Sequence, residues 1–184
     1  LLSKTIYTHF LKVLISIVGC AGDWEMKAEK KVSSETPLFE LTLRKYEKPQ
    51  TKKERELVKR LCLSLGLLQP GDSRDVVVDV LHVLLKGRKK KQLLSVEDVE
   101  KKVIINRKLH KLEMQGIAPS NIRRQIKRLR NLMLVEKIKS RYRISEFLGM
   151  SEIFADKIEK FLLLGVVQRV KDYLTAADEL FSRK

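Results

Sequence analysis

Cysteine is scarce in this chain, and its scarcity argues against two classes of protein. The 184 residues include two cysteines, Cys20 and Cys62, which lie far apart and form no C-x-x-C pair. A zinc finger needs closely spaced cysteine and histidine ligands, and a disulfide scaffold needs several cysteines. The sequence therefore predicts no metal site and no disulfide framework, and it fits the reducing cytoplasm.

Acidic residues are few relative to basic ones. The chain has 23 Asp and Glu against 39 Lys and Arg, which gives a formal net charge of +16. Such a surplus indicates a polyanionic partner, either nucleic acid or, less commonly, an acidic membrane surface. A charged surface that only keeps a protein soluble at high temperature would more often balance the two signs. We therefore expect a nucleic-acid partner.

Long apolar runs are also missing. No stretch approaches the roughly 18 apolar residues of a membrane span, so we expect no membrane insertion. The N-terminal segment ends in IVGC, which is similar to a lipoprotein cleavage box, but His9 and Lys12 interrupt its apolar residues. The same residues fall at amphipathic helical spacing. A cytoplasmic helix over residues 3–18 is the favoured prediction, and secretion is the alternative.

Caps, prolines and glycines divide the chain into four parts. Residues 1–50 read as an N-terminal helical module, whose second helix would start at Thr36-Pro37 and end near Tyr46. Residues 51–71 read as a connecting helix, opened by a capping box from Thr51 to Glu54 and ended at Gly66. Residues 72–145 hold three helices and a hairpin, and residues 146–184 are again helical.

The segment 72–145 begins with two helices. The first, rich in Val and Leu, would be capped by Asp72 or Ser73 and run to Gly87 as a central core helix. The second begins at a capping pattern from Ser95 to Asp98. Its alternation of apolar and polar residues continues to Gln115, and this pattern allows either one helix or two.

Residues 119–144 are the most informative stretch of the chain. Ile122, Ile126, Leu129 and Met133 recur at helical spacing and would face a core, while basic residues occupy the opposite face. A short hairpin follows, with Tyr142 and Ile144 on one face and basic residues around its tip.

This order of elements resembles the winged-helix family, most closely its small bacterial and archaeal transcriptional regulators. The resemblance is carried by IAPSNIRRQIKRLRNLMLVEKIKSRYRIS and covers about 70 residues. It implies a recognition helix over 119–133 and a wing over 134–145. Two departures are Ala118, where the family usually has a small polar cap, and a long segment from Ile104 to Gln115.

The fold prediction is accordingly a mainly α winged helix-turn-helix with a short two-stranded β wing, flanked by N-terminal and C-terminal helices. We expect a sequence-specific double-stranded DNA-binding protein and transcriptional regulator. The candidates for base contacts are Ser120, Asn121, Arg123, Arg124 and Lys127. The candidates for phosphate contacts are Arg128 and Arg130, and those in the wing are Lys137, Lys139, Arg141 and Arg143.

Two other functions are alternatives to DNA binding. An RNA-binding or protein-assembly role could use the same winged helix, although surface aromatics of the kind that stack on single strands are missing. An enzyme is disfavoured because the sequence has no glycine-rich phosphate loop, no Cys-His or Ser-His-Asp set and no cofactor motif. The histidines His9, His82 and His110 are isolated from one another.

The C-terminal segment carries an apolar stripe from Ile158 to Phe181. It predicts a homodimer interface, since operators are commonly bound by symmetric dimers. The alternative is that the stripe packs on the N-terminal helices. A small-molecule effector pocket in residues 1–50, lined by Trp24, Phe39, Tyr46 and Cys20, is a further alternative that no motif supports.

Overall fold

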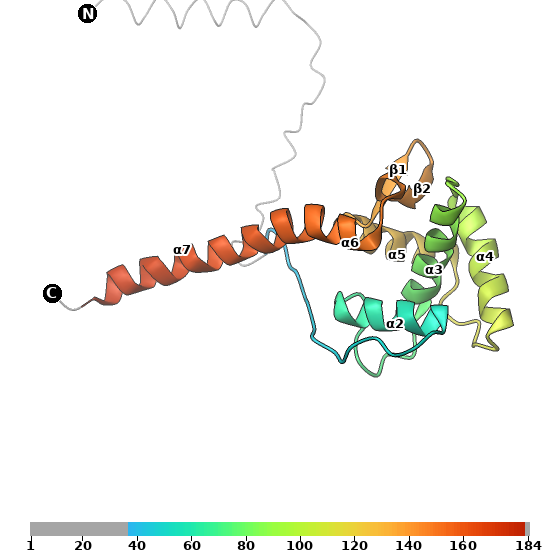
Figure 1. Ribbon diagram of the computed structural model, residues 1–184, viewed down its shortest axis with the longest axis horizontal. Helices are drawn as coiled ribbons and strands as arrows, with labels where there is room; N and C mark the ends of the chain where they lie inside the picture. The colour runs from blue at the N-terminus through green and yellow to red at the C-terminus, as the bar shows by residue number, and fades with distance from the viewer. Residues whose placement is uncertain (1–36, 183–184) are drawn as a thin grey trace, which may run out of the picture. The chain divides into compact units, whose positions relative to one another are not determined.

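The structure is a computed structural model that describes residues 37–182 (Figure 1). These residues are mainly helical and include a two-stranded antiparallel sheet, as the sequence predicts at the level of fold class. The helix predicted over residues 3–18 lies outside the described residues, and so do Cys20 and Trp24.

Within residues 37–182, four helices precede the sheet: α2 (Glu54–Ser64), α3 (Val76–Lys89), α4 (Val96–Leu109) and α5 (Pro119–Asn131). The strands β1 (Val135–Ile138) and β2 (Arg141–Ile144) form a hairpin. A 3₁₀ turn, η1 (Ser145–Phe147), leads to α6 (Met150–Ile153), the π-helical segment η2 (Phe154–Leu163) and α7 (Leu164–Phe181). The last three follow one another as one rod in Figure 1.

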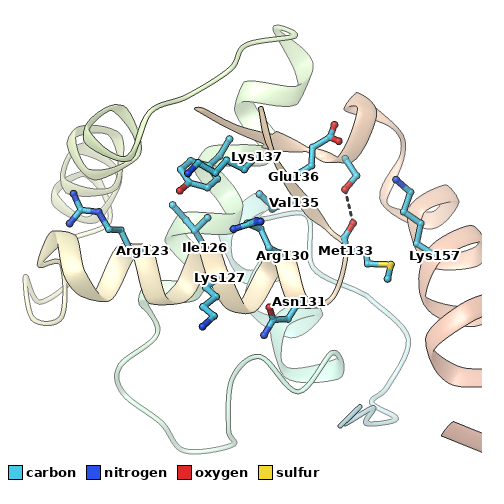
Figure 2. Close-up of a pocket in the computed structure, with 12 residues that line it drawn as sticks. Arg123, Ile126, Lys127, Arg130, Asn131, Met133, Val135, Glu136, Lys137 and Lys157 are labelled. Atoms are coloured by element: carbon cyan, nitrogen blue, oxygen red, sulfur yellow. Dashed lines mark hydrogen bonds between the residues drawn. The ribbon is translucent and has the colours of Figure 1, made fainter. Parts of the chain in front are cut away.

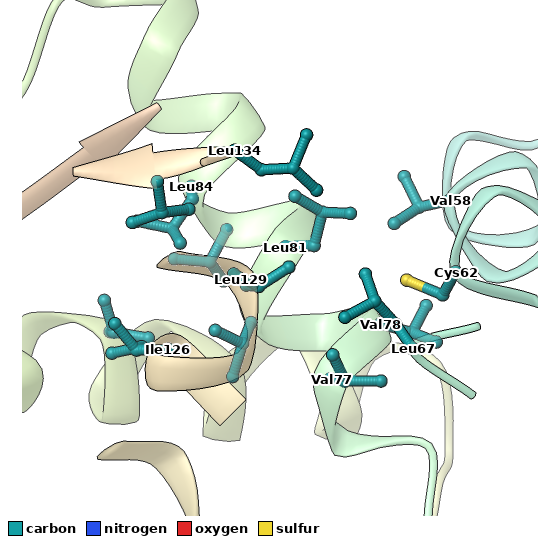
Figure 3. Close-up of a cluster of buried hydrophobic side chains, with 14 of the residues drawn as sticks. Val58, Cys62, Leu67, Val77, Val78, Leu81, Leu84, Ile126, Leu129 and Leu134 are labelled. Carbon is teal, nitrogen blue, oxygen red and sulfur yellow. The ribbon is translucent and has the colours of Figure 1, made fainter. Parts of the chain in front are cut away.

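Helix α3 is the centre of the core, as its run of Val and Leu predicts. Ten of its 14 residues are buried, and it contacts α2, α4, α5 and β2. Leu81 and Leu84 meet Ile126 and Leu129 of α5 in the cluster drawn in Figure 3. Removing one such aliphatic side chain typically costs about 2–5 kcal/mol, so this cluster fixes where α5 lies.

The helix predicted from Thr36-Pro37 to Tyr46 is wrong, because residues 37–53 form neither helix nor strand. Phe39 and Leu41 are half-buried against the core, with the exposed Glu40 between them. The Arg44 guanidinium donates to the backbone carbonyls of Leu63 and Leu68, both at 3.2 Å. Tertiary contacts at the end of α2 therefore hold this segment, where local preference predicted a helix.

The predicted helix caps are corrected at two places. Helix α2 begins at Glu54 after Lys53, and the Thr51 hydroxyl accepts from the Lys53 backbone N–H at 3.2 Å, so the predicted capping box does not form. Helix α3 begins after Asp75, later than the predicted Asp72 or Ser73. The Asp75 carboxylate makes no cap hydrogen bond because it is engaged in the ion pairs described below.

The capping box at the start of α4 is confirmed. The Ser95 hydroxyl accepts from the Asp98 backbone N–H at 3.1 Å, and the Asp98 carboxylate accepts from the Ser95 N–H at 3.0 Å. The helix ends at Leu109, earlier than the limit at Gln115 that its polarity allows. One helix therefore occupies this segment.

A buried ion-pair cluster joins α2, α3 and α4, and the sequence interpretation missed it. Asp79 is fully buried and accepts from Arg55 Nε and Asn106 Nδ2, each at 2.9 Å, and from Arg107. Asp75 accepts from Arg55 at 2.7 Å and from Arg107 at 3.0 Å. Burial alone would raise the pKa of Asp75, but these hydrogen bonds outweigh it and hold the pKa below the ordinary value.

His82 lies beside this cluster and is 4% exposed. Its Nε2 is 3.2 Å from a carboxylate oxygen of Glu54, and its Nδ1 is 3.3 Å from Asn106 Nδ2. Burial is the main cause that lowers the pKa of His82 from 6.5, and it outweighs the opposite effect of Glu54. The native state therefore favours the neutral ring.

This histidine predicts a loss of stability in mild acid. Because the unfolded chain binds the proton more readily, the free energy of unfolding should fall as the pH drops below about 6.5. Urea unfolding at pH 7.5 and pH 5.5 measures the change. A His82→Gln variant serves as control and should lose this part of the pH dependence. Equal pH dependence in both proteins would contradict the prediction.

Candidate nucleic-acid interface

The turn before α5 fixes how that helix starts. Gly116 has a positive φ of 75°, and an added Cβ would come within 3.2 Å of a Val76 methyl carbon. Asn121 Nδ2 donates to the Gly116 carbonyl at 2.6 Å. Pro119 occupies the first turn of the helix, where its missing N–H costs nothing. Helix α5 starts without a side-chain cap, and the turn at Gly116 and Pro119 together set where it begins.

The aliphatic face of α5 is buried as predicted. Ile122, Ile126 and Leu129 are at most 1% exposed. The prediction for Met133 is wrong, because α5 ends at Asn131 and Met133 has a φ of 57° and is 40% exposed. Leu132 and Leu134 take the buried positions around it, since the chain leaves the helix to enter β1.

The opposite face of α5 is cationic and open to solvent. Ser120, Arg123, Arg124, Lys127 and Arg130 are exposed. Arg123 comes no nearer to Glu97 than 3.9 Å, and both side chains are more than half exposed, so this pair contributes little. Within residues 37–182, Arg124 and Lys127 form no ion pair. This face therefore keeps its positive charge available for a partner.

Two predicted residues of α5 are partly engaged inside the protein. Asn121 is half-buried, donating to Gly116 and accepting from Gln125 Nε2 at 3.0 Å. Arg128 is exposed but donates to Gln125 Oε1 at 3.0 Å. We therefore assign Asn121 to positioning of the helix, and we retain Arg128 as a cation at the edge of the exposed face.

Three of the four cations predicted in the hairpin are exposed to solvent. Its strands pair from Val135 with Ile144 to Ile138 with Arg141, which leaves two residues in the turn. Lys137, Lys139 and Arg141 are exposed. Leu94, which precedes α4, exchanges two backbone hydrogen bonds with Tyr142, at 2.9 and 2.7 Å. These bonds attach β2 to the helical core and fix the direction in which the hairpin projects.

Arg143 differs from the other hairpin cations. Its Nε donates to Glu136 at 2.6 Å, and its guanidinium lies 4.6 Å from the centroid of the Phe147 ring. Burial alone would raise the pKa of Glu136, but the backbone N–H of Glu146 and the Arg143 side chain hold it below its ordinary value. Arg143 therefore stabilises the base of the hairpin and is not free for a partner.

A hollow of about 600 Å³ lies between α5 and the hairpin. Its charged lining consists of Arg123, Lys127, Arg130, Lys137, Lys157 and Glu136, so cations outnumber acids (Figure 2). Lys157 of η2 also lines the hollow, although the sequence did not predict it. Its Nζ lies 2.6 Å from Glu146, which is not part of the lining. Because Lys157 follows the last residue of the hairpin by 13 residues, no local pattern in the sequence predicted this lysine here.

Other kinds of site find little support in the described part of the chain. Burial raises the pKa of the Cys62 thiol to about 12, which leaves it protonated and shielded from reagents. Residues 37–182 hold no group of three His, Cys, Asp or Glu side chains placed to bind a metal ion. None of the helices described is both long and apolar enough to cross a bilayer.

Comparison with known proteins gives this chain no relative: no family model matches it, and neither does any curated protein or solved structure.

Proposed function

We propose that residues 72–145 form a winged helix-turn-helix domain that binds double-stranded DNA in a sequence-specific manner, and that the protein is a transcriptional regulator. The order of elements supports this: α3, the short extended contact at Leu94, α4, α5 and then the β1–β2 hairpin. In a winged helix the third helix enters the major groove and the hairpin follows it as the wing.

The main observation in support of the proposal is that α5 has one buried aliphatic face and one exposed cationic face. Ile122, Ile126 and Leu129 anchor the helix on α3, so Arg123, Arg124 and Lys127 point away from the core. The major groove admits one α-helix, and arginine can donate two hydrogen bonds to guanine O6 and N7. Side chains near the start of α5 are therefore the proposed readers of base sequence.

The hairpin and the hollow supply the electrostatic part of the proposal. Arg130 and Lys137 line a concavity that suits one sugar-phosphate strand while α5 lies in the neighbouring groove. Phosphate contacts position a protein on the duplex but carry little sequence information. The proposed base contacts are Ser120, Arg123, Arg124 and Lys127. The proposed backbone contacts are Arg128, Arg130, Lys137, Lys139 and Arg141.

Lys139→Ala tests the wing. Lys139 is exposed in the hairpin turn, so its removal should weaken binding to all duplex sequences alike. The slope of log K against log salt should become shallower by about one unit, because one fewer counterion is released. Fluorescence anisotropy titrations at several salt concentrations measure both effects.

Lys52→Ala is the matched control for this prediction, because Lys52 is exposed in the segment before α2. It should leave affinity and salt slope unchanged. Equal effects of the two substitutions would mean that Lys139 contributes no more to DNA binding than any other exposed lysine. A loss for Lys139→Ala confined to one DNA sequence would contradict its assignment to the backbone.

A further inference from the structure

Helix α7 keeps a broad apolar face uncovered. None of its 18 residues is buried. Six large apolar side chains that share one face retain between 39% and 80% of their surface exposed: Val167, Val170, Tyr173, Leu174, Leu180 and Phe181. A contiguous exposed apolar patch of this kind usually marks an interface in a soluble protein.

The spacing of this face is that of a helix that packs along another helix. Leu163, Val167, Val170, Leu174, Ala177 and Phe181 recur at alternating steps of four and three residues. This 3.5-residue repeat is the pattern of a coiled coil. Val166, Tyr173 and Leu180 widen the stripe on one side. A long, straight partner helix therefore fits this face better than a loop or a small ligand.

We propose that the partner is α7 of a second copy of this chain, packed in the antiparallel direction. An aromatic side chain can bury roughly 150–250 Å² and an aliphatic one somewhat less, so this face could bury on the order of 700 Å² per chain. A specific interface of ordinary size buries about 800 Å² per partner. The face is therefore nearly sufficient for a dimer without help from the rest of the protein.

Charge complementarity decides for the antiparallel direction. Lys171 and Asp178 are exposed seven residues apart on one flank of the stripe, and the other flank carries the apolar Val166, Tyr173 and Leu180. A two-fold axis perpendicular to the helices brings like flanks together, so Lys171 of one copy faces Asp178 of the other, twice by symmetry. A parallel pair would instead place Lys171 beside the apolar Val166 and Asp178 beside Tyr173, which forms no charge pair.

The register that pairs these charges also overlaps the part of the stripe within α7 with its symmetry mate. When Lys171 lies opposite Asp178, residue 167 lies opposite residue 182, near the end of the described chain. The stripe from Val167 to Phe181 then overlaps its own symmetry mate along its full length.

The first test uses sedimentation equilibrium of the full 184-residue chain without nucleic acid. We expect a dimer at tens of micromolar protein. Leu174→Asp at the centre of the stripe should weaken dimerisation at least tenfold and leave the far-ultraviolet circular dichroism unchanged, because Leu174 supports no core contact. The control Thr175→Asp adds the same charge on the polar face and should leave the dimer intact.

Two outcomes of this test would overturn the proposal. A chain that stays monomeric at 100 µM would exclude the second copy and leave an intramolecular partner, such as residues 1–36, for the stripe. A dimer that is as tight with Leu174→Asp as with the unchanged chain would place the interface elsewhere.

Charge exchange tests the direction. Lys171→Glu and Asp178→Lys should each weaken the dimer severalfold, since each puts like charges opposite each other twice. The double variant should recover most of the affinity, because it restores two opposite-charge pairs. In a parallel dimer Lys171 and Asp178 would not face each other, so neither single variant would weaken it through like charges. Unchanged affinity in both single variants would overturn the antiparallel arrangement. These measurements involve no DNA, so their outcome is independent of the proposed function.

Discussion

Asp79→Ala is expected to lower the free energy of unfolding by about 3–5 kcal/mol, the usual cost of removing one partner from a buried ion pair. Asp79 is fully buried between Arg55 and Arg107, and the Arg107 side chain is 4% exposed. Without the Asp79 carboxylate, Asp75 alone would remain to pair with the two guanidinium groups. Urea unfolding followed by circular dichroism measures the loss.

An exposed aspartate supplies the control for Asp79→Ala. Asp72 lies 3.7 Å from Arg74, whose side chain is 79% exposed, so Asp72→Ala should cost less than about 1 kcal/mol. A loss of under 1 kcal/mol for Asp79→Ala would mean that the cluster contributes little. The cluster holds α4 in place, and α4 leads through a turn into α5. We therefore expect that Asp79→Ala also weakens the proposed nucleic-acid binding at temperatures near the unfolding midpoint of the variant.

Arg124→Ala is expected to cost about 1–3 kcal/mol of affinity for a preferred DNA sequence, which is the usual worth of one bidentate base contact. Arg124 is exposed in the first half of α5 and forms no ion pair within residues 37–182. Affinity for random duplex DNA should fall much less, since one lost charge is only one lost phosphate interaction. Competition titrations with both duplexes separate the two contributions.

Arg128→Ala is the matched control for base reading, because it removes the same kind of side chain from the edge of the same helix. Its loss should be similar on preferred and random DNA, as expected for a phosphate contact. Circular dichroism should show that both variants fold, since neither side chain lies in the core. Equal losses on both duplexes for Arg124→Ala would remove its role as a reader of bases.

The local elements of the fold were predictable because their signals lie within one turn or one repeat. Ile122, Ile126 and Leu129 share a helix face by spacing alone, and their burial follows. Ser95 and Asp98 cap α4 through contacts three residues apart. The exposed cations of α5 could be named for the same reason, since they are the remainder of an amphipathic pattern.

Features that depend on distant partners were not predictable from these patterns. Asp79 pairs with side chains 24 and 28 residues away, and its only local signal is a charge within an apolar helix. Phe39 and Leu41 lie against the core, where a proline-led helix was expected. From the sequence alone, Arg143 is predicted to be a free cation of the hairpin. In the structure it forms an ion pair with Glu136, which lies opposite it on the neighbouring strand. In each case a tertiary contact overrides the local preference.

The central claim is that the cationic face of α5 reads double-stranded DNA. Its most direct test is to select preferred fragments from a pool of random duplex DNA, and then to compare their affinity with that of random duplex DNA and duplex RNA at two salt concentrations. The account predicts that the selected DNA binds at least 10³-fold more tightly than random DNA, as specific regulators do, and that RNA competes poorly. Equal affinity for all three, or tighter binding of the RNA, would contradict it.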